Sequence, residues 1–279
     1  MINRADLFNA CVAEGKPQKD VFGHKTDMMK TALSDLRAAL RLLSRLPVPA
    51  GASQDMQRGA ASMWALPLAG AVIGAIAALA GSIAAWLGLP PSLQAALILS
   101  TLIIITGALH EDGLADSADG LWGGWDRDRR LGIMKDSRIG SYGVIALVLS
   151  LLIRWAALSA LLSAGASPWL VVGVAALSRA PMVATMALLP GARDHGMSAS
   201  AGRPGPQVMW LALGTGAIIA LLSTGFPALW AVFWVAAAAA GAGLIAQAKI
   251  GGQTGDILGA TQQLAEIAAL LSLCATLIP

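Results

Sequence analysis

"GAASMWALPLAGAVIGAIAALAGSIAAWLGLPPSLQAALILSTLIIITGALH", residues 59–110, contains no lysine, arginine, aspartate or glutamate. A membrane-crossing helix needs about 20 apolar residues, so this stretch is long enough for two crossings with a reversal at the Gly/Pro cluster 88–92. Residues 204–248 form a second stretch without charge. Hydrophobic residues make up 56% of the 279 and charged residues only 13%, so the composition predicts an integral membrane protein.

The order of apolar runs and helix breakers predicts an all-α, polytopic membrane bundle of about seven transmembrane helices. Two further Gly/Pro clusters, 165–168 and 224–227, mark reversals between neighbouring helices. We expect a mobile N-terminal extension over residues 1–34 and a single membrane catalytic domain over residues 35–279. The predicted crossings are residues 66–88, 93–109, 142–163, 168–189, 207–224, 227–246 and 263–279.

Lysine and arginine fall on one side of this predicted topology. With the N-terminus inside, the cytoplasmic segments hold 17 of the 19 lysines and arginines, and the turns on the opposite side hold none. The positive-inside rule then predicts a multi-pass protein of the cytoplasmic (inner) membrane, with its N-terminus and active site on the cytoplasmic side. Residues 1–20 are polar, so we expect no cleavable signal peptide.

Residues 28–46 predict an amphipathic helix before the first crossing. An apolar face and a basic face follow from the helical spacing of Met29, Leu33, Leu36, Leu40 and Leu43 on one side and of Arg37, Arg41 and Arg45 on the other. Such a helix is typical of a segment that lies in the membrane interface among anionic head groups. The alternative is a helix that packs against the protein itself.

Seven acidic and five basic side chains are concentrated in residues 107–143, between two apolar stretches. Asp112, Asp116 and Asp119 share one face if the helix of the preceding crossing continues through them. Oxygen-only carboxylate ligands suit Mg2+ or Mn2+, bound together with substrate phosphate oxygens. A solvated acidic face is the alternative, but the position at a membrane boundary, next to a basic segment, favours a metal site.

Glycines and basic residues follow the acids. Gly140 is one of several glycines whose N–H groups suit phosphate oxygens, although glycines also serve simply to pack membrane helices. Lys135 and Arg138 are the stronger catalytic candidates for holding phosphate. His110 is either a catalytic proton acceptor, a group that orients a carboxylate, or a structural histidine. The other basic residues of the segment are expected to anchor the membrane edge, namely Arg127, Arg129 and Arg130.

Three ionisable residues, Arg154, Arg179 and Glu266, lie within predicted crossings or at the end of one. Because ionisable groups are costly inside a membrane, each is a candidate functional residue, and Arg179 is the predicted substrate-binding one. A structural pair between Glu266 and one arginine is equally consistent with the sequence.

Several segments resemble the signature of the cobalamin synthase family, the adenosylcobinamide-GDP ribazoletransferases. "HEDGLADSADG" (110–120) and "RRLGIMKDSRIGSYG" (129–143) carry most of the resemblance. The family's N-terminal and C-terminal motifs are similar to "LLSRLPVP" (42–49) and "GGQTGDILGATQQLAEIAALL" (251–271), and "LSR" (177–179) also fits. The resemblance covers residues 35–279 in the same order and leaves residues 1–34 outside.

The resemblance implies a Mg2+-dependent transfer in which the 5'-hydroxyl of α-ribazole, or its 5'-phosphate form, attacks the cobinamide-bearing phosphorus of adenosylcobinamide-GDP. GMP leaves, and adenosylcobalamin or its 5'-phosphate is formed. The implied partners are these substrates and the lipid bilayer, without nucleic acid. Metal binding is expected from Asp112, the most important ligand, and from Asp116, Asp119, Asp136 and Asp256.

The last polar segment of the chain is expected to form a second wall of the site. Gln253, Thr254 and Asp256 lie between glycines and would bind metal or recognise a substrate hydroxyl or amide. The alternative is a capped turn before the last crossing.

Two other functions compete with this interpretation. CDP-alcohol phosphotransferases also use spaced aspartates at a membrane edge, but Asp116 stands here where their usual signature has arginine. An ion-coupled transporter would carry its acids in mid-span and contain internal repeats, whereas these acids cluster at one boundary.

Overall fold

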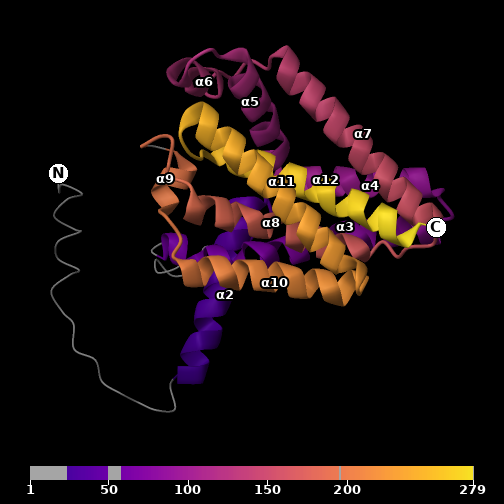
Figure 1. Cartoon of the computed structure of the whole chain (residues 1–279). Coiled ribbons are helices and arrows are strands. Elements are labelled where there is room, and N and C mark those ends of the chain that lie inside the picture. Colours follow the sequence, from indigo (N-terminus) through magenta and orange to yellow (C-terminus); the bar gives the residue numbers. More distant parts are fainter. Residues whose placement is uncertain (1–23, 50–57, 195, 279) are drawn as a thin grey trace. The chain divides into compact units, whose positions relative to one another are not determined.

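The computed structural model describes residues 24–49, 58–194 and 196–278 (Figure 1). The chain divides into two compact units, Met1–Leu33 and Ser34–Pro279, and each is described by itself. In the first unit, residues 24–33 begin helix α2, His24–Leu43. The rest of the predicted N-terminal extension, residues 1–23, lies outside the described residues.

The described residues are all-α, as predicted, with one isolated β-bridge between Gly191 and Gln253. Each predicted crossing corresponds to one helix, although several boundaries move. After α2 the elements are η2 Gly59–Ala65, α3 Leu66–Trp86, α4 Pro91–Thr106, α5 Leu109–Gly123, α6 Arg127–Ile133, α7 Ser141–Ser163, α8 Leu170–Leu188, α9 Met197–Ala201, α10 Pro206–Thr224, α11 Pro227–Ile250 and α12 Gly255–Leu277.

Six of these helices are long and apolar enough to cross a bilayer: α3 together with η2, α7, α8, α10, α11 and α12. Helix α4 has 16 residues and passes the same test only together with α5, to which it is joined at an angle of 85°. We assign α4 as the seventh crossing. Since α5 carries four carboxylates and turns away sharply, we treat it as lying outside the crossing segments.

Helices α8 and α12 form the interior of the second unit. Helix α8 packs against α3, α10 and α12, and α12 packs against α5, α7, α8 and α11. Small residues permit these approaches, because a side chain at Gly70 or Gly74 of α3 would collide with the α8 backbone at Ala175 or Val171. Large apolar side chains remain exposed on the outer helices, as expected of surfaces that face lipid, including Ile153, Trp210, Leu222, Trp230 and Phe233.

The α4–α5 bend is built from two successive residues in the left-handed conformation. Gly107 has φ of 64° and Ala108 has φ of 59°, and Ala108 is the one non-glycine residue with positive φ in the described part of the chain. The backbone N–H of Arg45 bonds the carbonyl of Ile105 at 2.7 Å, next to the bend. The expectation of one continuous helix through Asp112 is therefore wrong, and the acids lie on a separate helix.

The second half of α2, residues 34–43, belongs to the second unit and packs into its core, which was the predicted alternative to an interfacial helix. Ala39 and Leu43 are buried in the core, and Asp35 is buried in an ion pair with Arg58, with N–O 2.7 Å. Trp64 donates a further hydrogen bond to Asp35 at 2.8 Å. This part of α2 therefore belongs to the fold.

Helix α12 begins eight residues before the predicted crossing at 263. Thr254 is its N-cap, and the Thr254 hydroxyl accepts a hydrogen bond from the Ile257 N–H at 3.3 Å. The predicted alternative of a capped turn is thus confirmed for Thr254. Helix α5 crosses α12 where Gly113 meets Gly259, since a Cβ at Gly113 would lie 3.1 Å from the Gly259 Cα. The early start of α12 places Asp256 in its first turn, beside α5.

Candidate functional site

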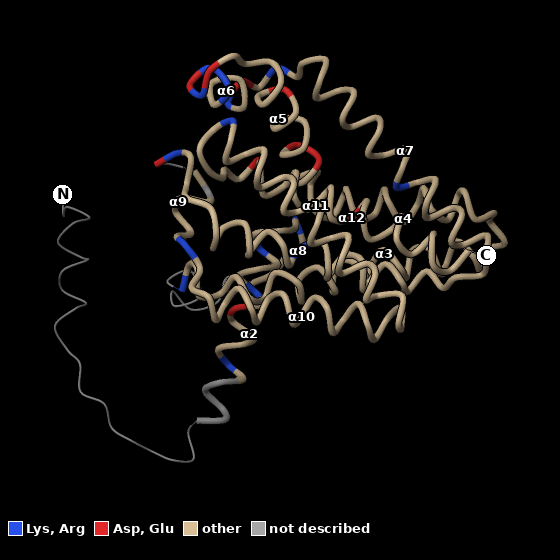
Figure 2. The backbone as a smooth tube through the Cα atoms, in the orientation of Figure 1, with Lys and Arg blue, Asp and Glu red and all other residues tan. Residues whose placement is uncertain are grey.

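Charged residues gather around α5, α6 and the segment before α9, whereas α10 has none (Figure 2). The basic residues Arg127 and Arg130 hold the carboxyl end of α11 there. Arg127 donates to the carbonyls of Ile250 and Ala192 at 2.9 and 2.7 Å, and Arg130 donates to the Lys249 carbonyl at 2.9 Å. These contacts satisfy carbonyls that a helix end leaves unpaired, so both arginines have a structural role.

Three carboxylates from two distant segments act on one another at this end of the bundle. Asp112 is exposed and Asp116 half-buried on α5, while Asp256 projects from the first turn of α12. Burial, and after it the negative charges of Asp112, Asp256 and Asp119, raise the pKa of Asp116 to about 7. The positive charge of Arg193 acts in the opposite direction and lowers the pKa of Asp116. The cluster therefore concentrates negative charge with little compensation, which a bound cation would relieve.

Arg193 is a site residue that the sequence interpretation missed. A guanidinium nitrogen, Nη1, lies 3.3 Å from Oδ2 of Asp256, and Nη2 donates to the carbonyl of Leu131 at 2.9 Å. Its Nε is buried and has no hydrogen-bond partner within the described part of the chain. No signal in the sequence singles out Arg193, because nothing in its spacing links it to Asp256, 63 positions later.

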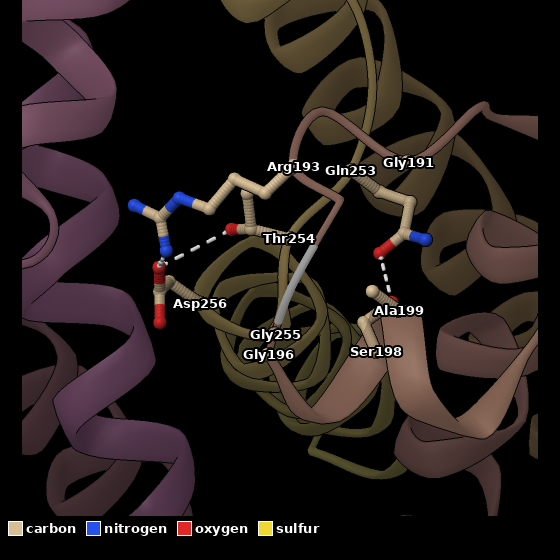
Figure 3. A pocket seen from close by; sticks show the side chains of 9 residues that line it. All are labelled: Gly191, Arg193, Gly196, Ser198, Ala199, Gln253, Thr254, Gly255 and Asp256. Atoms are coloured by element: carbon tan, nitrogen blue, oxygen red, sulfur yellow. Dashed lines mark hydrogen bonds and ion pairs between the residues drawn. The ribbon is translucent and has the colours of Figure 1, made fainter. Parts of the chain in front are cut away.

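The loop that carries Arg193 is fixed to the segment before α12. Ala192 donates to the Gln253 carbonyl and Gln253 donates to the Pro190 carbonyl, both at 2.8 Å. A cavity of about 120 Å³ lies between the two segments (Figure 3). Its lining residues are Gly191, Arg193, Gly196, Ser198, Ala199, Gln253, Thr254, Gly255 and Asp256. The structure thus brings the predicted residues Gln253, Thr254 and Asp256 to one polar cleft.

Within this cleft the polar side chains orient one another (Figure 3). The Thr254 hydroxyl donates to Oδ2 of Asp256 at 3.2 Å, the same oxygen that Arg193 approaches. The Ser198 hydroxyl donates to Oε1 of Gln253 at 2.6 Å. Both interactions hold side chains that carry further donors and acceptors at the edge of the cavity.

Asp119 and Gly140, predicted as a metal ligand and a substrate-binding residue, bind each other. The carboxylate of Asp119 accepts hydrogen bonds from the N–H groups of Gly140 at 2.6 Å and Gly143 at 2.9 Å. A Cβ at either glycine would collide with that carboxylate. A negative charge at the N-terminus of α7 is stabilising, so this contact fixes α5 to α7.

Lys135, Asp136 and Arg138 occupy the loop between α6 and α7. Arg138 is 87% exposed and pairs with Asp136, with Nη2 and Oδ2 2.7 Å apart. The hydrogen bond from Arg138 holds the pKa of Asp136 below its usual value, and the charges that act on Asp136 are those of Arg138 and Arg129. Lys135 is also exposed. The structure therefore gives Asp136 a local partner and does not bring it to the Asp112 cluster.

A buried ionic network joins three helices in the core of the bundle. Arg154 of α7 lies 3.2 Å from both Glu111 of α5 and Glu266 of α12. Gln263 donates to Glu111 at 3.1 Å and Gln262 donates to Glu266 at 2.7 Å. The predicted structural pair between Glu266 and an arginine is confirmed, with Glu111 as a further member that the sequence interpretation missed.

Arg179 and His110 are buried beside this network. Arg179 donates to the Ala175 carbonyl at 2.8 Å within its own helix, and its charged neighbours include Glu266 and Glu111. His110 is 2% exposed, and its Nε2 has no hydrogen-bond partner among residues that the structure describes. Arg179 is therefore not brought to the polar cleft, whereas His110 lines a neighbouring apolar cavity that shares Ser198 and Gly255 with the cleft.

The donor chemistry of the cluster fits a hard divalent cation that substrate helps to bind. Asp112, Asp116 and Asp256 provide oxygen ligands only, as Mg2+ prefers. Across residues 24–49, 58–194 and 196–278, no three acidic, histidine or cysteine side chains form a group that could hold a metal by themselves. Mg2+ commonly binds through one or two carboxylates together with substrate phosphates, so this arrangement fits a site that substrate completes.

Fold and site together define a multi-pass helical membrane protein with a polar, acid- and arginine-lined site at one end of its bundle. The model of one family, described as cobalamin-5-phosphate synthase, matches residues 35–274. The chain belongs to this family. The matched range includes α5 and most of α12, which supply the carboxylate cluster.

Curated relatives carry the name adenosylcobinamide-GDP ribazoletransferase. One from Bradyrhizobium diazoefficiens is 46% identical over 254 residues, covering 88% of this chain and 95% of the relative. One from Azorhizobium caulinodans is 47% identical over 252 residues, covering 86% and 94%. One from Mesorhizobium japonicum is 44% identical over 241 residues, covering 86% and 92%. No solved structure matches this chain.

Proposed function

We propose that this protein is a membrane transferase that joins α-ribazole, or its 5'-phosphate, to adenosylcobinamide-GDP. The ribazole hydroxyl oxygen forms the new bond to the cobinamide-bearing phosphorus, the bond from that phosphorus to GMP breaks, and adenosylcobalamin or its 5'-phosphate results. The observation that carries the proposal is the meeting of Asp112 and Asp116 of α5 with Asp256 of α12 in a chain of this family.

We propose that Asp112, Asp116 and Asp256 hold Mg2+, with Mn2+ as a substitute, and that one or two of them bind it directly together with substrate phosphate oxygens. A divalent cation supplies, when bound, neutralisation of charge on pyrophosphate oxygens and on the leaving phosphate. The support is the oxygen-only donor set and the raised pKa of Asp116, which is caused by burial and then by the negative charges of Asp112 and Asp256. Asp119 is left out, because both of its oxygens accept hydrogen bonds from the start of α7.

Arg193 is proposed to bind a phosphate of adenosylcobinamide-GDP. Asp256 and the Leu131 carbonyl hold its guanidinium at the cleft, and the unpartnered Nε remains as a donor. A guanidinium held in this way suits phosphate oxygens, and phosphoryl transfer needs positioning and charge neutralisation more than a protein nucleophile. Gln253 and Thr254, on the same wall, are proposed to orient substrate hydroxyl or amide groups.

The setting of the reaction is proposed from the distribution of charge. We propose that the chain lies in the cytoplasmic membrane, with the polar cleft and the α5–α6 segment on the cytoplasmic side. The support is the number of lysines and arginines in the segments at that side and their absence from the opposite turns.

The test is a transfer assay on the full chain in membranes. Adenosylcobinamide-GDP, α-ribazole and Mg2+ are expected to yield GMP and a complete cobamide in equal amounts, and removal of divalent cations is expected to stop the reaction. A CDP-alcohol offered in place of adenosylcobinamide-GDP should yield no CMP. Well-folded protein that forms no cobamide with either Mg2+ or Mn2+ would refute the proposal.

A further inference from the structure

An apolar cavity of about 60 Å³ lies directly beside the polar cleft, and the two share Ser198 and Gly255. Leucine and methionine side chains from several elements form most of its wall. They include Leu43, Met63, Met182, Met186 and Leu258. A ligand that fills both cavities must therefore join an apolar part to a polar part within a short distance.

Two polar side chains, His110 and Ser198, interrupt this apolar wall, and the Ser198 hydroxyl is already bonded to Gln253. His110 lines the cavity, is 2% exposed, and carries a buried Nε2 atom without a hydrogen-bond partner in the described residues. A buried polar atom without a partner is costly, and such atoms are usually satisfied by water or by a ligand. The cavity thus combines an apolar lining on most sides with one lining residue, His110, that has an unsatisfied polar atom.

We infer that this cavity binds the flat, methyl-substituted aromatic base of the ribazole nucleoside, with His110 Nε2 donating a hydrogen bond to the ring nitrogen that is not attached to the sugar. The inference rests on the proposed function and deepens it. With the base in the apolar cavity, the attached ribose reaches the cleft through the shared residues Ser198 and Gly255. The reacting hydroxyl then lies on the side of the cleft that carries Asp256.

The other groups of the two substrates fit this cavity less well. Guanine carries several donors and acceptors along its edge, and the wall offers one unpartnered polar atom, so most of them would be buried unsatisfied. A corrin is far larger than the available volume. A cavity of about 60 Å³ has room for about four to six water molecules, at about 10–15 Å³ each on this measure, which is the scale of one bicyclic ring.

The test compares binding of two nucleosides to the full chain in lipid nanodiscs by equilibrium dialysis, without the second substrate. One nucleoside is α-ribazole and the other is a phenolic riboside, whose base has no ring nitrogen. His110→Leu is expected to weaken binding of α-ribazole about tenfold and to change binding of the phenolic riboside by less than about twofold. His110→Gln, which keeps a donor near the Nε2 position, is expected to restore most of the preference.

A second pair of variants tests the apolar wall. Met186→Ala enlarges the cavity, so it is expected to improve binding of a nucleoside with a tricyclic base at least fivefold relative to α-ribazole. Met209→Ala removes a buried side chain outside the cavity and is expected to leave this preference unchanged. Equal losses for both nucleosides in His110→Leu, together with no change of base preference in Met186→Ala, would overturn the inference. Binding that follows these expectations without release of GMP would instead count against the proposed function alone.

Discussion

The buried network around Arg154 supports a quantitative prediction about the stability of the bundle. Arg154 contacts Glu111 and Glu266 at 3.2 Å, and the side-chain exposures of the three are 1%, 10% and 4%. Arg154→Met would leave two buried carboxylates to share the positive charge of Arg179. Breaking a buried ion pair in this way costs about 3–5 kcal/mol, which is a large part of a typical unfolding free energy of about 5–15 kcal/mol.

The same reasoning predicts a rescue. When Arg154→Met is combined with Glu111→Gln, the remaining buried charges, Arg179 and Glu266, balance each other, and the cost should fall to within about 1–2 kcal/mol of the wild type. Thermal unfolding of the detergent-solubilised full chain is the assay, with exposed Arg129→Met as a control expected to stay within about 0.5 kcal/mol. A wild-type melting temperature for Arg154→Met, or a double variant no more stable than the single one, would refute this account of the network.

Further predictions concern the cleft and its supports. Arg193→Lys keeps the positive charge but loses the guanidinium fork, so kcat/KM for adenosylcobinamide-GDP should fall about 10- to 100-fold in the transfer assay. An unchanged kcat/KM would show that Arg193 does not bind the phosphate. Because the folded state binds a proton on Asp116 more tightly than the unfolded state does, Mg2+-free stability should fall as pH rises from about 4 to about 7, and Asp116→Asn should abolish that fall in thermal melts. If the stability of Asp116→Asn falls over the same pH range, Asp116 is not the group that causes the fall. Asp119→Asn leaves one N–H at the start of α7 without an acceptor, so the free energy of unfolding should fall by about 1–3 kcal/mol in the same melts. Thr254→Ala removes the N-cap of α12 and should lower it by about 1 kcal/mol. An unchanged free energy of unfolding in Asp119→Asn would mean that the α5–α7 contact is not made in solution.

The sequence predicts the helices well because hydropathy and Gly/Pro breakers are local signals. The start of α12 is predicted too late, since the polar residues from Thr254 to Gln263 lower hydropathy even though the helix has begun. The bend after α4 also lacks a clear local signal in the sequence. Gly107 favours a helix end, but Ala108 gives no indication of a left-handed conformation.

The candidate site could be predicted in part. The sequence interpretation identified Asp112, Asp116 and Asp256 as site residues, and in the structure the charges of Asp112 and Asp256 act on Asp116. Glu111 was missed because neighbouring residues on a helix point about 100° apart, so an acid beside Asp112 faces the core and Arg154 instead of the cleft. Arg193 was missed because its contact with Asp256 depends on how a loop pairs with a distant segment.

The most direct test of the central claim is the dependence of GMP release on Asp112, Asp256 and Mg2+. In vesicles supplied with adenosylcobinamide-GDP and α-ribazole, Asp112→Asn and Asp256→Asn are expected to reduce turnover at least about 100-fold at any Mg2+ concentration. Asp128→Asn, a nearby carboxylate that is 92% exposed, should leave turnover unchanged. Near-wild-type turnover in Asp112→Asn and Asp256→Asn, or equal loss in all three variants, would contradict a catalytic site built from α5 and α12.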